Sequence, residues 1–229
     1  MSQKPTFLAL LILAGAGFSQ TPAPAALPAS ELNTVLARMD EGSKRFKSGQ
    51  ADFKSVVYTA VVKDSDEKTG QIFARRKDGS QEVAIRILAP HPMQALLKGS
   101  KALIYDPKIN QTTEQNIGDK ADAQSVMNLA SAFGIKGQEL LRDYDVTLAG
   151  WEMVDNVKTA RLEMVPRKAS VKNLFTKVVL WIDLERDVAL QQQRFESSGD
   201  YQLAHYTNIK MPDKISDEFF AIKKGGGRQ

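Results

Sequence analysis

Residues 100–118, SKALIYDPKINQTTEQNIG, predict a β-hairpin. The first half of this stretch is rich in apolar and aromatic side chains, which suit a half-buried strand. Residues 106–110 (DPKIN) then supply a turn, because Pro107 sets φ at a turn position and Asn110 tolerates a left-handed one. One hairpin by itself indicates no function. The chain on both sides, however, repeats the same strand–turn–strand pattern.

Alternating apolar residues and turn signals predict about eleven strands in all. Besides the hairpin, they are expected at residues 53–62, 71–77, 81–88, 93–98, 144–150, 158–166, 175–184, 188–197 and 201–211, with a last edge strand at 219–222. Asp78-Gly79 is a strong hairpin signal, and the charged run at 63–70 is expected to be a turn. Antiparallel connections of this kind produce a sheet that curls, because twist accumulates from strand to strand.

Three segments have the periodicity of helices. The first is expected to begin at Ser30 as N-cap, with its apolar stripe opposite charged residues. The second spans residues 119–133, with Asp119 or Asp122 near its start and Gly134 just past its end, and a short third helix covers 137–142. The expected fold is therefore mainly β (α+β), an unclosed, strongly curved antiparallel β-barrel of about eleven strands with a lid of two to three α-helices.

The N-terminus has the features of a secretory signal peptide. Lys4 provides a positive charge, residues 7–16 (FLALLILAGA) are an apolar run too short to span a bilayer, and residues 14–16 (AGA) fit a cleavage site. The alternative is an uncleaved membrane anchor. The expected boundaries are 1–25 for the cleaved signal peptide and the start of a Pro/Ala-rich linker, 26–223 for a single domain, and 224–229 for a flexible tail.

Composition narrows the function classes. The 229 residues include no cysteine, so neither a disulfide nor a lipid-bearing cysteine is expected. The formal net charge of +4 comes from basic residues spread among acidic ones, so nucleic-acid binding is not expected either. An exported protein that is soluble after signal cleavage, and periplasmic in a bacterium with two membranes, is the resulting expectation.

Signals of catalysis are weak. Only two histidines occur, His91 beside prolines and His205 in an expected strand. The sequence shows no nucleophile elbow, no metal-ligand spacing and no phosphate-binding loop. We therefore expect no catalytic residues, no metal and no cofactor, and the protein is predicted not to be an enzyme.

A curved sheet covered by amphipathic helices has a concave apolar face. Such an interior is either a filled core or, if the helices stand off the sheet, a ligand cavity. The expected inward-facing residues are Phe53, Val57, Phe73, Ile85, Leu103, Ile104, Tyr105, Val126, Leu129, Phe133, Leu162, Leu180 and Ile182.

Several local strings resemble one known family. They are residues 70–76 (GQIFARR), 97–107 (LKGSKALIYDP), 181–183 (WID) and the closing Phe219-Phe220. Together with the order of elements, they resemble the LolA-like periplasmic outer-membrane lipoprotein carriers, and most closely the lipoprotein-sorting proteins of that family. The resemblance implies an unclosed barrel whose apolar cavity shields the acyl chains of a lipoprotein.

The same resemblance implies a role for Arg76. In the carriers, an arginine at the end of the second strand helps to hold the lid closed, and Arg76 matches its position best. This chain has Lys77 where the family has proline, and the alternative reading of Arg76 is an exposed strand charge.

The predicted function is that of a periplasmic carrier that moves lipoproteins from the inner to the outer membrane. The resemblance implies as partners acylated lipoproteins or lipids, an inner-membrane release complex and an outer-membrane acceptor, and we expect a monomer. The alternative is an envelope sensor or adaptor that uses the same fold to bind a lipid or a regulatory partner protein. The stress regulators that share the fold carry an additional domain, for which this chain is expected to be too short.

Overall fold

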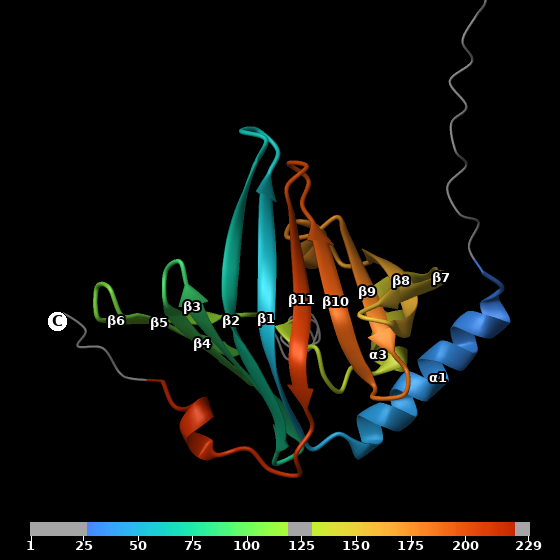
Figure 1. Ribbon diagram of the computed structural model, residues 1–229, viewed down its shortest axis with the longest axis horizontal. Helices are drawn as coiled ribbons and strands as arrows, with labels where there is room; N and C mark the ends of the chain where they lie inside the picture. Colours follow the sequence, from blue (N-terminus) through green and yellow to red (C-terminus); the bar gives the residue numbers. More distant parts are fainter. Residues whose placement is uncertain (1–26, 119–129, 223–229) are drawn as a thin grey trace, which may run out of the picture.

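The computed structural model describes residues 27–118 and 130–222. Eleven strands of this part form one antiparallel sheet in the order β6-β5-β4-β3-β2-β1-β11-β10-β9-β8-β7 (Figure 1). Their bounds are β1 Ser48–Thr59, β2 Asp64–Lys77, β3 Ser80–Ala89, β4 Met93–Lys98, β5 Lys101–Asp106, β6 Gln111–Asn116, β7 Tyr144–Val154, β8 Val157–Pro166, β9 Lys177–Asp183, β10 Val188–Phe195 and β11 Tyr201–Lys210.

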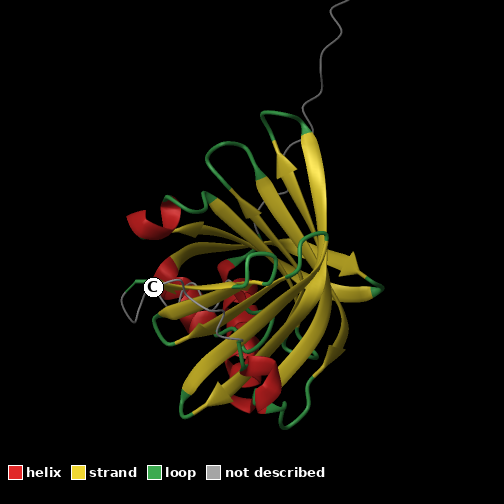
Figure 2. Ribbon diagram, turned by 90° about the vertical axis from the view of Figure 1, so that its left-hand side faces the viewer, coloured by secondary structure: helices red, strands yellow, loops and turns green. Residues whose placement is uncertain are grey.

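The sheet consists of two meanders, β1–β6 and β7–β11, joined in the middle where β1 pairs with β11. Strands β6 and β7 are the two edges and do not pair with each other, so the sheet is strongly curved but does not close (Figure 2). The expected fold class, an unclosed curved barrel with a helical lid, is confirmed.

Helix α1 (Ala29–Arg45) covers part of the concave face. It buries Val35, Leu36 and Met39 in the same core cluster as the concave-face side chains of the strands. The helix begins after Pro28, and Ser30 lies inside its first turn instead of capping it. Proline is tolerated at this place because the first N–H groups of a helix have no partner within it.

Three short helices complete the described elements. They are α3 (Gly137–Asp143), α4 (Ala169–Lys172) and the 3₁₀ helix η1 (Asp217–Phe220). Helix α3 confirms the short helix expected at 137–142 and lies directly against α1, where a Cβ on Gly137 would be 2.4 Å from the Leu36 carbonyl oxygen. The expected helix at 119–133 falls mostly outside the described residues, as do Asp119, Asp122 and the expected signal peptide. Its expected end was wrong, because residues 131–133 are not helical and Phe133 forms a β-bridge with Val188.

Both predicted hairpin turns are present. Asn110 adopts a left-handed conformation with φ +49° between β5 and β6. Asp78 and Gly79 have φ +51° and +76°, and Lys77 pairs with Ser80 across them. Two left-handed central residues match the twist of the flanking strands, which explains why Asp-Gly is favoured there.

Two expectations were wrong. Most of the charged run at 63–70 belongs to β2, which begins at Asp64, and its polar side chains are accommodated because they are exposed or pair across strands, as in Lys54–Glu67 at 2.7 Å. Residues 219–222 do not form an edge strand, because Phe219 and Phe220 pack onto the outer face of the sheet as part of η1.

No helix in residues 27–118 and 130–222 is long and apolar enough to cross a membrane.

Candidate functional site

The concave face encloses a cavity of about 230 Å³ between strands from both meanders. Apolar side chains form most of its described lining, and a smaller polar group lies at one side. The lining consists of Phe53, Ile72, Ile85, Ile87, Ala95, Ala130 and Ala204, with the polar residues Ser55, Lys68, Arg194, Gln202 and Tyr206.

Strand register explains why the apolar residues meet. Ile72 pairs with Ile85, and Ile85 pairs with Ala95 on the next strand, so all three side chains point to the same face. Phe53 pairs with Gly70, where a Cβ would lie 2.6 Å from the Phe53 ring. The glycine therefore leaves room for the Phe53 ring beside the cavity.

The sequence-predicted residues separate into groups. Phe53 and Ile85 line the cavity, whereas Val57 and Ile104 are half-buried on the same face without lining it. Val126 and Leu129 lie outside the described residues. The remaining concave-face residues are close-packed in the core beside the cavity, with at most 2% of their surface exposed: Phe133, Leu162, Leu180 and Ile182.

Phe73, Leu103 and Tyr105 lie on the opposite face, which corrects their expected placement. Phe73 and Leu103 belong to a second apolar cluster on the outer face, where the Phe73 ring stacks on Phe219 with centroids 4.4 Å apart. Tyr105 lies two residues after Leu103 on β5 and therefore points to the same face, and its hydroxyl donates a hydrogen bond to Asn110 Oδ1 at 3.2 Å. A strand that is apolar on both faces gives no pattern from which to choose the inward one.

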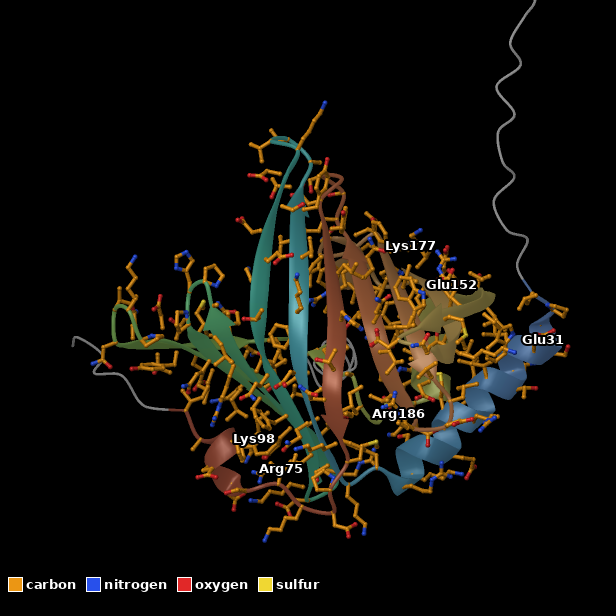
Figure 3. All side chains as sticks on the ribbon, viewed as in Figure 1. Glu31, Arg75, Lys98, Glu152, Lys177 and Arg186 are labelled. Atoms are coloured by element: carbon orange, nitrogen blue, oxygen red, sulfur yellow. The ribbon has the colours of Figure 1, made fainter. Side chains whose placement is uncertain are left out.

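The outer cluster is held by an ionic group that the sequence did not reveal. The Glu82 carboxylate accepts hydrogen bonds from Arg75 Nε at 2.7 Å and from Lys98 Nζ at 2.8 Å. Arg75 also contacts Asp217 and lies 3.9 Å over the Phe220 ring. Figure 3 shows Arg75 and Lys98 beside the C-terminal 3₁₀ helix, which this group fixes to the sheet.

Arg76 points to the concave side and contacts α1. Its Nη1 donates a hydrogen bond to the Ser43 carbonyl oxygen at 3.0 Å, and its Nη2 lies 3.4 Å from Ser43 Oγ. Ser43 Oγ in turn donates to the Gly134 carbonyl oxygen at 3.1 Å. Opposite Arg76 on β3, Gln81 Nε2 donates to Ser131 Oγ and to the Phe133 carbonyl oxygen, at 3.0 and 3.2 Å.

These contacts connect the end of the β2–β3 hairpin with α1 and with residues 131–134. Sequence reasoning found Arg76 but missed Ser43 and Gln81. Ser43 and Gln81 are polar residues that are largely buried. A polar side chain on the inward side of a helix or a strand was the only sequence signal for either residue.

Metal chemistry receives no support from the described residues. No group of three histidine, cysteine or acidic side chains in residues 27–118 and 130–222 is placed to hold a metal ion. His205, the strand histidine, has its Nε2 2.7 Å from Asp155 Oδ2 at the surface.

Solved structures share this fold at low sequence identity. A conserved protein from Thermus thermophilus matches with a TM-score of 0.55 and 11% identity, over 85% of this chain and 95% of that one. MucB matches with a TM-score of 0.53 and 16% identity, over 86% of this chain and 64% of MucB, so this chain spans slightly less than two thirds of MucB. The LolA superfamily protein NE2245 from Nitrosomonas europaea also matches, at a TM-score of 0.43, 15% identity, and 83% and 97% coverage.

The search of curated proteins gave no match. The fold that the resemblance implied, an unclosed antiparallel sheet with a helix over its concave face, is confirmed. A family model described as "uncharacterized protein" matches residues 83–223, which is more than half of the chain, and the chain belongs to this family.

Proposed function

We propose that this protein is an exported carrier that shields acyl chains in its concave cavity and moves acylated lipoproteins from the inner to the outer membrane. The observation that carries the proposal is the cavity in the concave face beside the apolar side chains of Phe53, Ile72 and Ile85. Each buried methylene group contributes about 0.8 kcal/mol, so an acyl chain gains several kcal/mol on entering such a space.

The cavity volume limits what fits in the closed conformation. At about 30 Å³ for each water-sized group, 230 Å³ holds about seven or eight such groups, comparable to one short acyl chain. A cargo with several chains therefore requires the lid to move. The polar contacts of Arg76 and Gln81 with Ser43 and residues 131–134 are suited to this role, since a few hydrogen bonds hold a lid and still permit release.

A binding experiment with a matched pair of variants tests the proposal. The purified protein should retain a fluorescent fatty acyl probe and should capture acylated lipoprotein from membranes. Ile85→Asp places a charge in the cavity lining and should abolish retention, whereas Leu103→Asp changes the opposite face and should leave it unchanged. A wild-type protein that retains no probe at micromolar concentration contradicts the proposal.

The proposal also covers the domain boundaries, the location and the partners of the protein. Residues 1–25 act as a cleaved signal peptide and linker and 26–223 belong to one domain, and the tail expected at 224–229 lies outside the described residues. The mature protein works as a periplasmic monomer between an inner-membrane release complex and an outer-membrane acceptor, without catalytic activity. N-terminal sequencing of the exported protein tests the cleavage site.

A second function is favoured by one observation, the shared fold with MucB, of which a complex with MucA from Pseudomonas aeruginosa has been solved. In this alternative the protein is an envelope sensor or adaptor that binds a regulatory partner protein. Pull-down from envelope extracts separates the two functions, because a sensor recovers a signalling protein and no lipoproteins.

A further inference from the structure

A polar row crosses the apolar cavity on four neighbouring strands. Lys68 on β2 pairs with Ser55 on β1, and Gln202 on β11 pairs with Arg194 on β10. All four side chains line the cavity. The fully apolar part of the lining, formed by Ile85 and its neighbours, lies on β3 and β4 at the other side.

Hydrogen bonds orient this row. Arg194 Nη2 donates to Gln202 Oε1 at 2.6 Å, and Gln202 Nε2 donates to Ser55 Oγ at 2.8 Å. The glutamine amide is thereby fixed with its oxygen toward the guanidinium. A guanidinium has five N–H donors, and this bond uses one of them.

Within the described part of the chain, neither cation of the row belongs to an ion pair. No carboxylate in residues 27–118 and 130–222 forms an ion pair with Lys68 or Arg194, whereas Arg75 on the outer face is paired with Glu82. The Arg194 side chain is half-buried, with its guanidinium 5.4 Å from the Phe175 ring, and burial lowers its pKa. Holding a charge in such a place is costly unless an anion pairs with it.

We propose that Arg194, assisted by Lys68, binds the anionic head of an acyl-chain amphiphile whose tail lies in the apolar part of the cavity. The shared chemistry is a carboxylate or phosphate oxygen at the end of a single chain, and a fatty acid and a lysophospholipid are its two sources. The head lies at the β10 side, and the tail extends toward Ile85 and Ala95. This inference rests on the proposed function and names the ligand class of the same cavity.

Titration of the purified full-length protein with amphiphiles of equal chain length tests the headgroup directly. Laurate and dodecyl phosphate carry an anionic head, and methyl laurate carries the same chain without a charge. A charge-assisted hydrogen bond should make each anionic probe bind about tenfold or more tightly than methyl laurate. A preference for only one of the two anionic probes supports the proposal and identifies the source.

Three variants assign the preference to the residue. Arg194→Met should bind all three probes with the affinity of methyl laurate, because the chain contacts remain, and Arg194→Lys should keep part of the preference. Arg167→Met removes an exposed arginine that pairs with Asp145 and does not line the cavity, and should behave as wild type. If Arg194→Met does not fold, as judged by circular dichroism, two measurements still test the headgroup inference. They are the comparison of the three probes on the wild type and the same comparison on Arg194→Lys.

The results that would contradict the headgroup inference differ from those that would contradict the carrier function. Equal binding of laurate and methyl laurate by the wild type overturns the headgroup inference and leaves the proposed carrier function standing. No binding of any probe overturns both. Inorganic phosphate that binds as tightly as dodecyl phosphate overturns the inference by showing a site for free anions.

Discussion

Arg75 and Arg76 are adjacent in sequence and contact opposite sides of the sheet, which makes them a matched pair for testing the lid. Replacing Arg76 with methionine removes its bond to the Ser43 carbonyl oxygen, which lies in the last turn of α1. Carbonyl groups there have no partner within the helix, and a basic side chain close to them is favourable. The neighbouring Arg75→Met instead breaks the contacts with Glu82 and Asp217 that hold the C-terminal helix.

The expected magnitude comes from the contacts. The 3.0 Å bond of Arg76 is well formed and the 3.4 Å contact is marginal, so about one charge-assisted hydrogen bond is lost. Such a bond contributes about 1.5–3 kcal/mol, and because Arg76 is only half-buried we expect a loss around the lower end of this range, about 1–2 kcal/mol. The equilibrium between closed and open lid then shifts by roughly 5- to 30-fold.

Two assays separate the lid from general stability. In urea, both arginine variants should unfold at lower midpoint than the wild type with an unchanged slope. In stopped-flow mixing with a fluorescent acyl probe, only Arg76→Met should load and release the probe faster, by several-fold. Equal probe kinetics in both variants would refute the reasoning that Arg76 holds the lid.

Three further outcomes are expected. Burial raises the pKa of Glu82, but hydrogen bonds from Lys98 and Arg75 outweigh this effect and hold the pKa below its ordinary value of 4.5. The ionised Glu82 carboxylate therefore stabilises the folded protein fully above pH 4.5, and this stabilisation is lost as the pH falls through the lower folded pKa. Thermal unfolding should show a smaller loss of stability on acidification in Glu82→Gln, and an unchanged slope counts against the ion pairs. Tyr144→Phe should be neutral or stabilise by about 1 kcal/mol in urea unfolding, because the buried hydroxyl has no partner among the described residues; a clear destabilisation contradicts this. Gly49→Val should destabilise the folded protein by about 1–3 kcal/mol, because a Cβ at this position would lie 2.6 Å from the Phe133 ring. A variant that unfolds in urea at the wild-type midpoint would argue against this close packing.

Local patterns predicted most of the strands because each needs only a few neighbouring residues. The turn at Asp78-Gly79 requires two left-handed residues, which this dipeptide adopts readily, so the β2–β3 hairpin could be placed from sequence. The end of the chain could not be placed in the same way. Phe219 and Phe220 look like strand residues, and only the apolar outer surface around Phe73 explains why they form a 3₁₀ turn instead.

The cavity was predicted less completely than the fold. Phe53 lies between the charged residues Asp52 and Lys54, which indicates its inward side. Phe73 and Leu103 were assigned to the wrong face because their neighbours along the strand are apolar as well. The polar row was not predicted at all. Arg194 and Gln202 lie on different strands, and the pairing of β10 with β11 is what brings them together.

The sequence alone determined that the chain folds as a curved antiparallel sheet with an amphipathic helix, and that its family resemblance is LolA-like. The sheet and the helix follow from periodicity and turn chemistry, which act over a few residues, whereas the resemblance rests on local strings such as residues 97–107. Tertiary structure decided which face encloses the cavity and which contacts fix α1 and residues 131–134 to the β2–β3 hairpin. It also decided that the hairpin at residues 100–118 directs Ile104 inward and Leu103 outward. The physical reason is that a side chain's face in a doubly apolar sheet depends on what covers each side, and that is settled by segments distant in sequence.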